Sequence, residues 1–134
     1  MYDKIKTAAL KAYTDHEMAT IDFYNNVMQQ YQQDVPLQEA FSSNNVMRYL
    51  EKDILLRTID NKWIDHLHNI DMLKEGIGLR AYGQKDPLIE YKKEAYDLFN
   101  KMMAEIQSNT VRYIFRAKFG IQFVSEDGIE VLES

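Results

Sequence analysis

The fold is decided by one short stretch, Gly76-Ile77-Gly78-Leu79-Arg80-Ala81-Tyr82-Gly83-Gln84-Lys85-Asp86-Pro87. It holds four of the seven glycines and prolines in the 134-residue chain, and no glycine precedes it. β-Sandwiches and barrels need turn residues about every 8–12 positions, so a chain with so few does not fit them. Aromatic residues make up 12% of the chain, which is too many for a disordered segment. The composition therefore predicts an all-α fold that is interrupted at this stretch.

Apolar residues recur every three or four positions on both sides of the stretch, as expected for long amphipathic helices. From residue 46 to about 75 they are Leu56, Ile59, Trp63, Leu67, Ile70 and Leu73. From residue 87 to about 118 they include Leu88, Tyr91, Ala95, Leu98, Met102 and Ile106. At 1.5 Å per residue each helix is about 45 Å long. Two such helices joined by a short loop predict a long antiparallel helical hairpin.

The residues of the loop have distinct expected roles. We expect Gly76, Gly78 and Gly83 to end the first helix and to act as hinges. Asp86 is a preferred N-cap residue, and Pro87 suits the first helical position because its missing N–H costs nothing there. The loop therefore predicts a sharp start for the second helix.

The two ends of the chain are less regular. Helical spacing over residues 2–33 predicts N-terminal helix, as one helix or two, which must stop near Pro36 because proline disfavours a helical residue before it. A polar stretch follows, with Asn44 or Asn45 as N-cap candidates for the next helix. The acidic tail, residues 119–134, contains two short alternating runs, which predict either an extended linker or a small β-hairpin.

Composition excludes several classes of function. The chain has no cysteine, which removes disulfides, thiol catalysis and cysteine-bound zinc. No apolar run reaches the roughly 18 residues of a membrane span. A net charge of −5 gives no support for nucleic-acid binding.

Two nucleotide-binding patterns in the loop are coincidental. Gly76 and Gly78 begin a dinucleotide-type glycine pattern, but that motif needs a preceding strand and a long helix is expected there instead. The spacing from Gly78 to Gly83 nearly copies a P-loop, yet Gln84 stands where the phosphate-binding lysine belongs. We reject both readings and expect no catalytic residues in this chain.

No metal site is expected either. His66 and His68 are two positions apart, so they point in different directions on a helix and one ion cannot bind both. A histidine packed between two helices is the preferred interpretation of His66. The carboxylates on the same helix are typical of a solvated face.

Four polar or aromatic residues occupy the loop, namely Arg80, Tyr82, Gln84 and Lys85. Loop tips are often polar simply because they are solvated. An aromatic residue at a projecting tip costs solubility and usually contacts a partner, so Tyr82 favours a binding role.

A long mixed pattern around the loop resembles the C-terminal part of the SecA family, the ATP-driven motors that push unfolded preproteins through the bacterial SecY channel. The residues that carry the resemblance are Leu55, Leu56, Ile59, Asp60, Trp63, His66, Leu67, Asp71, Leu73, Gly76, Ile77, Leu79, Arg80, Tyr82, Gln84, Lys85, Asp86, Pro87, Leu88, Glu90, Tyr91, Lys92, Glu94, Ala95, Tyr96, Leu98 and Phe99. Residues 46–118 are densely covered and would form the two-helix finger of the helical scaffold. Residues 1–17, with Tyr13 and Glu17, resemble the end of the helical wing domain.

The resemblance implies a function for the loop. Tyr82 would be the tip aromatic that touches the translocating preprotein at the mouth of the SecY channel (SecYEG), with Arg80, Gln84 and Lys85 beside it. The finger would also pack on the remaining SecA domains, where this region restrains the ATPase. The implied location is cytoplasmic, at the inner face of the bacterial plasma membrane.

The chain departs from the family pattern in two ways. The connection over residues 18–45, within the wing-like segment 1–45, is unusually long. The nucleotide-binding domains, which would hold ATP and Mg²⁺, the preprotein cross-linking domain and the zinc tail are also lacking. We therefore expect a noncatalytic part of a larger motor, with no cofactor of its own.

Two other readings stay open at this point. The chain could be a free-standing helical interaction module that uses its apolar face as a groove or a dimer contact. Either residues 1–45 or a second copy of the chain would then cover that face, by self-association in the second case. An enzyme in its own right is the third reading, and no set of residues supports it.

Overall fold

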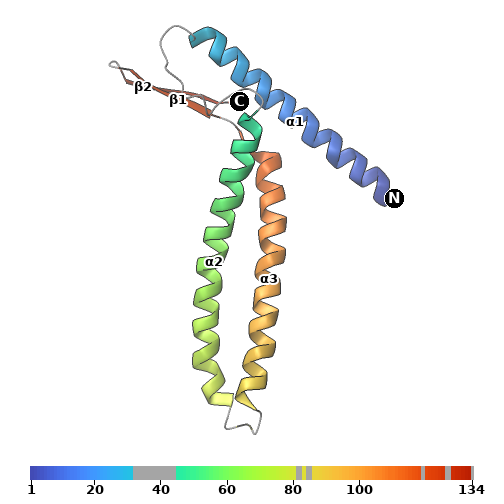
Figure 1. The fold of residues 1–134 in the computed structure, drawn as a ribbon, viewed down its shortest axis with the longest axis vertical. Helices are drawn as coiled ribbons and strands as arrows, with labels where there is room; N and C mark the ends of the chain where they lie inside the picture. Colours follow the sequence, from blue (N-terminus) through green and yellow to red (C-terminus); the bar gives the residue numbers. More distant parts are fainter. Residues whose placement is uncertain (32–44, 81–82, 84–85, 119, 126–127, 134) are drawn as a thin grey trace. The chain divides into compact units, whose positions relative to one another are not determined.

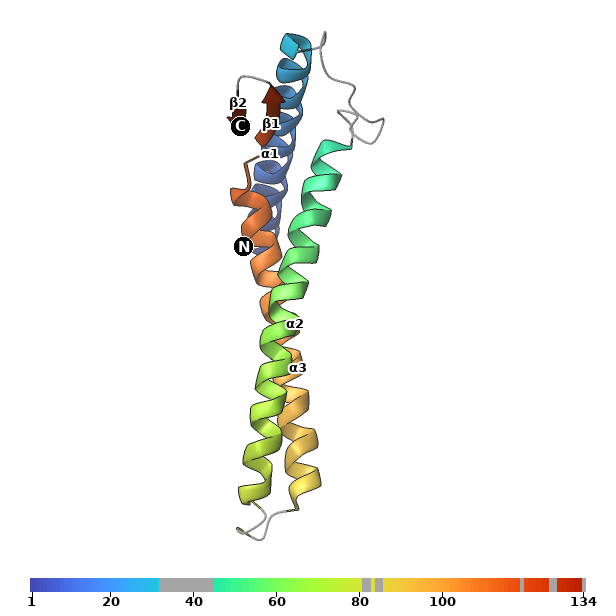
Figure 2. The ribbon, with the colours of Figure 1, turned by 90° about the vertical axis from the view of Figure 1, so that its left-hand side faces the viewer.

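The computed structural model describes residues 1–31, 45–80, 83, 86–118, 120–125 and 128–133. The elements are α1 (Tyr2–Tyr31), α2 (Val46–Arg80), α3 (Pro87–Arg116), β1 (Gly120–Ser125) and β2 (Gly128–Glu133). Figures 1 and 2 both show α2 and α3 side by side and antiparallel, joined at one end. The predicted long helical hairpin is therefore confirmed, and we call α2 and α3 together the hairpin.

The chain divides into two compact units. One unit is Ile54–Arg112, which contains most of the hairpin, and the other combines Met1–Asp53 with Tyr113–Ser134. Within the described residues, no helix combines the length and the apolar character that crossing a membrane requires.

The helix starts follow local rules of capping. The carbonyl of Asn45 accepts a hydrogen bond from the amide of Tyr49 at 2.9 Å, so Asn45 stands at the N-cap position of α2. Residues 32–44, where the sequence predicts a helix stop at Pro36 and a loop, lie outside the described residues. The N-terminal helical stretch forms a single helix, α1, which settles whether it is one helix or two.

The predicted end of α2 is wrong. The helix continues through Gly76 and Gly78 and ends at Arg80, so neither glycine belongs to the loop. A glycine inside a helix costs about 1 kcal/mol relative to alanine, which weakens a helix without stopping it. Between and after the glycines, the half-buried Ile77 and the ion-paired Arg80 hold the last turns in place.

Geometry does not require a glycine at either position. A Cβ added at Gly76 or Gly78 would meet no atom within 4 Å, and neither backbone has the left-handed conformation that favours glycine. The two residues therefore lower the stability of the last turns of α2 with no steric reason for their presence.

The unit Ile54–Arg112 has a narrow buried contact between its two helices. Its buried side chains are Thr58, His66, Leu73, Met102 and Ile106. Thr58 satisfies its hydroxyl within α2 by donating to the carbonyl of Ile54 at 2.7 Å. A two-helix contact can bury only one side of each helix, which leaves the remaining apolar residues exposed.

The other unit has its own buried residues, which are Thr20, Tyr24, Val27, Val46 and Met47. In the same unit, β1 and β2 form a two-stranded antiparallel sheet. The register runs from Gly120 opposite Glu133 to Ser125 opposite Gly128.

Candidate functional site

The end of the hairpin is held by an ion pair that joins its two helices. Arg80, the last residue of α2, directs its Nη1 to a carboxylate oxygen of Glu94 on α3. The same nitrogen lies 3.8 Å from Oε2 of Glu90, one turn earlier on α3. We call these three residues the Arg80 cluster.

The helix dipoles reinforce the Arg80 cluster. Arg80 is the basic residue in the last turn of α2, and Glu90 is the acidic residue in the first turn of α3. Positive charge is favourable at a helix C-terminus and negative charge at an N-terminus, each by about 0.3–1 kcal/mol. Both charges therefore suit the helix ends where they lie.

A side-chain cap defines the start of α3. The amide of Leu88 donates a hydrogen bond to Oδ1 of Asp86 at 2.9 Å, and the amide of Glu90 donates to the Asp86 carbonyl at 3.1 Å. Pro87 takes the first helical position, where no intrahelical donor is needed. Asp86 is therefore the N-cap residue of α3.

The segment between these anchors contains the other predicted contact residues. Residues 81–86, which we call the tip connection, join α2 to α3. Tyr82, Gln84 and Lys85 lie outside the described residues. Gly83 is described and exposed. Of the four predicted contact residues, the structure therefore places Arg80 alone, at the end of α2 and paired with α3.

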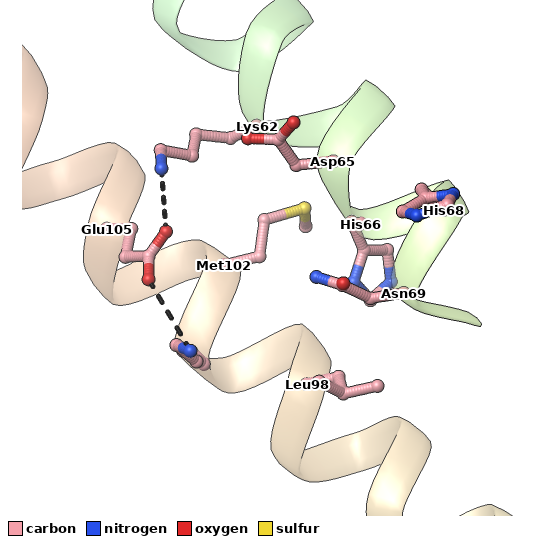
Figure 3. A pocket seen from close by; sticks show the side chains of 9 residues that line it. Lys62, Asp65, His66, His68, Asn69, Leu98, Met102 and Glu105 are labelled. Atoms are coloured by element: carbon pink, nitrogen blue, oxygen red, sulfur yellow. Dashed lines mark ion pairs between the residues drawn. The ribbon is translucent and has the colours of Figure 1, made fainter. Parts of the chain in front are cut away.

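A polar cleft lies between the helices further from the tip connection (Figure 3). Lys62 on α2 and Glu105 on α3 point toward each other across it, with Nζ 2.8 Å from Oε2. Nζ of Lys101 lies 4.0 Å from the other carboxylate oxygen of Glu105. The hydrogen bond from Lys62 lowers the pKa of Glu105 below its ordinary value.

His66 lies in the same cleft but takes part in packing. Its side chain is only 8% exposed, and its ring lies 5.6 Å from that of Trp63 and 6.1 Å from that of Phe99. This confirms the interpretation of His66 as a histidine packed between helices. Among the described residues, no group of three or more His, Asp or Glu is placed to hold a metal ion.

One side of the hairpin presents exposed apolar residues from both helices. We call this set the apolar side, and its members are Leu56, Ile59, Trp63, Leu67, Tyr96, Phe99 and Met103. The residues on α2 repeat every three or four positions, which aligns them along one side of a helix. The rings of Trp63 on α2 and Phe99 on α3 both lie near the ring of His66, so these two members come from facing helices.

A second ionic cluster lies in the unit that contains α1. Arg48 on α2 pairs with Glu17 on α1 and, at 2.9 Å, with Glu51 on its own helix. It also donates a hydrogen bond to the hydroxyl of Tyr13, which in turn donates to Glu51. The Tyr13 ring makes an edge contact with Phe115 on α3, with centroids 6.2 Å apart. We call these residues the Arg48 cluster.

Burial and charge act together on the Arg48 cluster. Burial raises the pKa of Tyr13, and the carboxylate of Glu51 raises it further. Burial alone would lower the pKa of Arg48, but its bonds to Tyr13 and Glu17 outweigh that effect and raise it. The sequence pointed to Tyr13 and Glu17 only through resemblance and did not identify Arg48 or Glu51.

These features define a helical scaffold domain, in which a long hairpin carries an ion pair at one end, a polar cleft and an apolar side. The model of the SecA wing and scaffold domain matches residues 1–118, and the chain belongs to this family.

Relatives with the name protein translocase subunit SecA support the assignment. The protein from Desulforamulus reducens is 63% identical over 70 residues, which are 52% of this chain and 8% of the relative. The protein from Solibacter usitatus is 46% identical over 112 residues, which are 84% of this chain and 11% of the relative. The chain thus matches about a tenth of the length of these relatives. No solved structure matches it.

Proposed function

We propose that this chain is a noncatalytic part of a SecA-type protein translocase, in which the hairpin is a two-helix finger. The tip connection contacts the unfolded preprotein at the SecY channel, and the helices couple that contact to the ATPase motor. The observation that carries the proposal is the long hairpin of the SecA wing and scaffold family, with Tyr82 in the six residues that join its helices.

The shape of the hairpin suits this task. At 1.5 Å per residue, the 35 residues of α2 and the 30 of α3 extend for about 45–50 Å. Ion pairs between the helices, at Arg80 with Glu94 and at Lys62 with Glu105, join them at two levels. Two helices that are joined in this way can transmit a displacement along their length.

The parts of the chain would have separate roles. Residues 1–45 would be the end of the wing domain, residues 46–118 the finger of the scaffold, and residues 119–134 an acidic tail. ATP and Mg²⁺ would bind to the motor domains of the whole translocase, which would work at the inner face of the plasma membrane.

The apolar side fits a place within a larger protein. Trp63 is 47% exposed and Phe99 is 43% exposed, although such side chains each bury about 150–250 Å² when covered. The remaining domains of the translocase would cover this side. Side chains spaced three or four residues apart form a ridge along a helix, and such a ridge can pack into the groove of another helix.

The test is substitution of Tyr82 in a full-length SecA-type translocase that carries this chain as its wing and scaffold. We expect Tyr82→Ala to lower preprotein transport into SecYEG vesicles by about tenfold, the effect of losing about 1.4 kcal/mol of contact energy. Tyr82→Phe is the matched control and should keep most transport, because the ring provides most of the contact area. Nucleotide binding should be the same in all three proteins. Transport by Tyr82→Ala at the unsubstituted rate would contradict the assignment of the tip.

A further inference from the structure

We propose that Arg80 is a positioning residue, which ties the end of α2 to the first two turns of α3 and so holds the tip connection in place. This inference rests on the proposed function of the tip. It also changes the role expected for Arg80, because the sequence resemblance implies direct contact with the preprotein.

The Arg80 side chain faces α3. The guanidinium of Arg80 is directed to Glu94, with Glu90 3.8 Å away, and both carboxylates belong to the facing helix. The Arg80 side chain is 42% exposed, so part of it is covered by the hairpin. The two carboxylates neutralise the positive charge of the guanidinium, so the preprotein would meet little net positive charge at Arg80.

The charges of the Arg80 cluster attract each other between the two helices. Glu90 and Glu94 are four residues apart on one helix, where like charges repel each other by a few tenths of a kcal/mol. The positive charge of Arg80 attracts both carboxylates from the facing helix and offsets their mutual repulsion. An isolated exposed pair contributes about 0–1 kcal/mol, and a network of three charges is the arrangement in which such pairs become effective.

The Arg80 cluster lies next to the tip connection in sequence. Arg80 is the last residue before the tip connection. Asp86 is the last residue of the tip connection, and its side chain caps α3. Side chains therefore hold both ends of the six-residue segment that contains Tyr82. Loss of the pair with Glu94 would release one end while the cap still held the other.

Charge reversal separates a positioning role from a contact role. In the full-length translocase, we expect Arg80→Glu and Glu94→Arg each to lower transport by about fivefold, the factor that corresponds to about 1 kcal/mol. The double variant, with both charges reversed, restores the attraction and should regain most of the transport rate. A direct contact between Arg80 and the preprotein predicts instead that the double variant stays as impaired as Arg80→Glu.

Lys74→Glu provides the matched control. Lys74 lies on α2 two turns before Arg80, is 59% exposed and pairs at 3.5 Å with Asp71 of its own helix. The substitution makes the same change of charge without touching α3, so transport should change little. Assays are run well below the melting temperature of the weakest variant, so that a loss of transport does not reflect unfolding.

The melting temperature of the isolated 134-residue chain tests the ion pair separately. Both single variants should lower it, and the double variant should recover it. If the double variant does not recover the melting temperature, the ion pair between Arg80 and Glu94 is contradicted, whatever the transport rate. Recovery of the melting temperature without recovery of transport overturns the positioning role. If Tyr82→Ala leaves transport unchanged, the proposed function of the tip fails, and the melting data still decide whether the pair exists.

Discussion

At the residue scale, the hairpin combines a small buried contact, which includes Leu73, Met102 and Ile106, with part-exposed ion pairs between its helices. Lys62, Glu105 and Arg80 join the helices by charge, while Trp63 and Phe99 lie at the rim of the contact around His66. Exposed ion pairs contribute little to stability one at a time, but they fix which residues face each other. The ion pairs therefore mark which residues of α2 and α3 face each other at two levels of the hairpin.

The pair between Lys62 and Glu105 makes the stability of the hairpin depend on pH. The pKa of Glu105 is lowered in the folded chain from its usual 4.5, chiefly by Lys62, so the pairing stabilises the fold above that value. The stabilisation is lost as the pH falls through the lowered pKa, because Glu105 then takes up a proton. We expect urea unfolding to show a stability difference between the unsubstituted chain and Glu105→Gln at neutral pH, and a smaller difference in acid.

A Lys62→Met background provides the control for this prediction. In that background, Glu105→Gln should change stability by less at neutral pH, because the main partner of the carboxylate is gone. Lys101 remains at 4.0 Å and accounts for any residual effect. A difference that grew as the pH fell would contradict the account of this pair.

The predictability of these residues depends on how far apart the interacting groups are in sequence. The cap at Asp86 can be read from Asp86 and Pro87 because capping is local. The pairing of Arg80 with Glu94 depends on the rotation of each helix about its axis, which apolar spacing alone does not determine. The Arg48 cluster combines residues from three helices, so nothing local could have identified it.

At the element scale, the two long helices follow from apolar spacing, while the end of α2 does not. Glycine was expected to stop the helix at residue 76, yet α2 continues to Arg80, because a glycine costs a helix only about 1 kcal/mol relative to alanine and does not end it by itself. The element was predictable and its boundary was not. Boundaries depend on tertiary contacts that a single sequence does not contain.

The glycines in α2 give a direct prediction. Gly76→Ala should raise the free energy of unfolding by about 0.5–1 kcal/mol, because a Cβ there meets no other atom and alanine favours the helix. Urea unfolding followed by circular dichroism measures the change. Gly78→Ala should raise the free energy of unfolding by a similar amount.

Ala104→Gly is the reciprocal control for the glycine prediction. Ala104 is exposed within α3, so this substitution should lower the free energy of unfolding by a similar amount. A loss of stability in Gly76→Ala would mean that the last turns of α2 need glycine after all.

At the scale of the whole molecule, the chain corresponds to a small part of much longer relatives. It belongs to the SecA wing and scaffold family and matches about a tenth of the length of relatives such as that of Solibacter usitatus, 11% in that case. An apolar face on the hairpin was expected from the sequence, and Trp63 and Phe99 are both exposed. Self-association of the isolated chain through this side stays a prediction.

The proposed contact between the tip connection and the preprotein can be tested by crosslinking from position 82. A photo-reactive amino acid replaces Tyr82 in the full-length translocase, and a preprotein is stalled in the SecY channel before irradiation. The matched control carries the same group at Asp97, which is exposed on α3 away from the tip connection. We predict crosslinks to the preprotein from position 82 and none from position 97. Absence of crosslinks from position 82, or equal yields from both positions, would contradict the account.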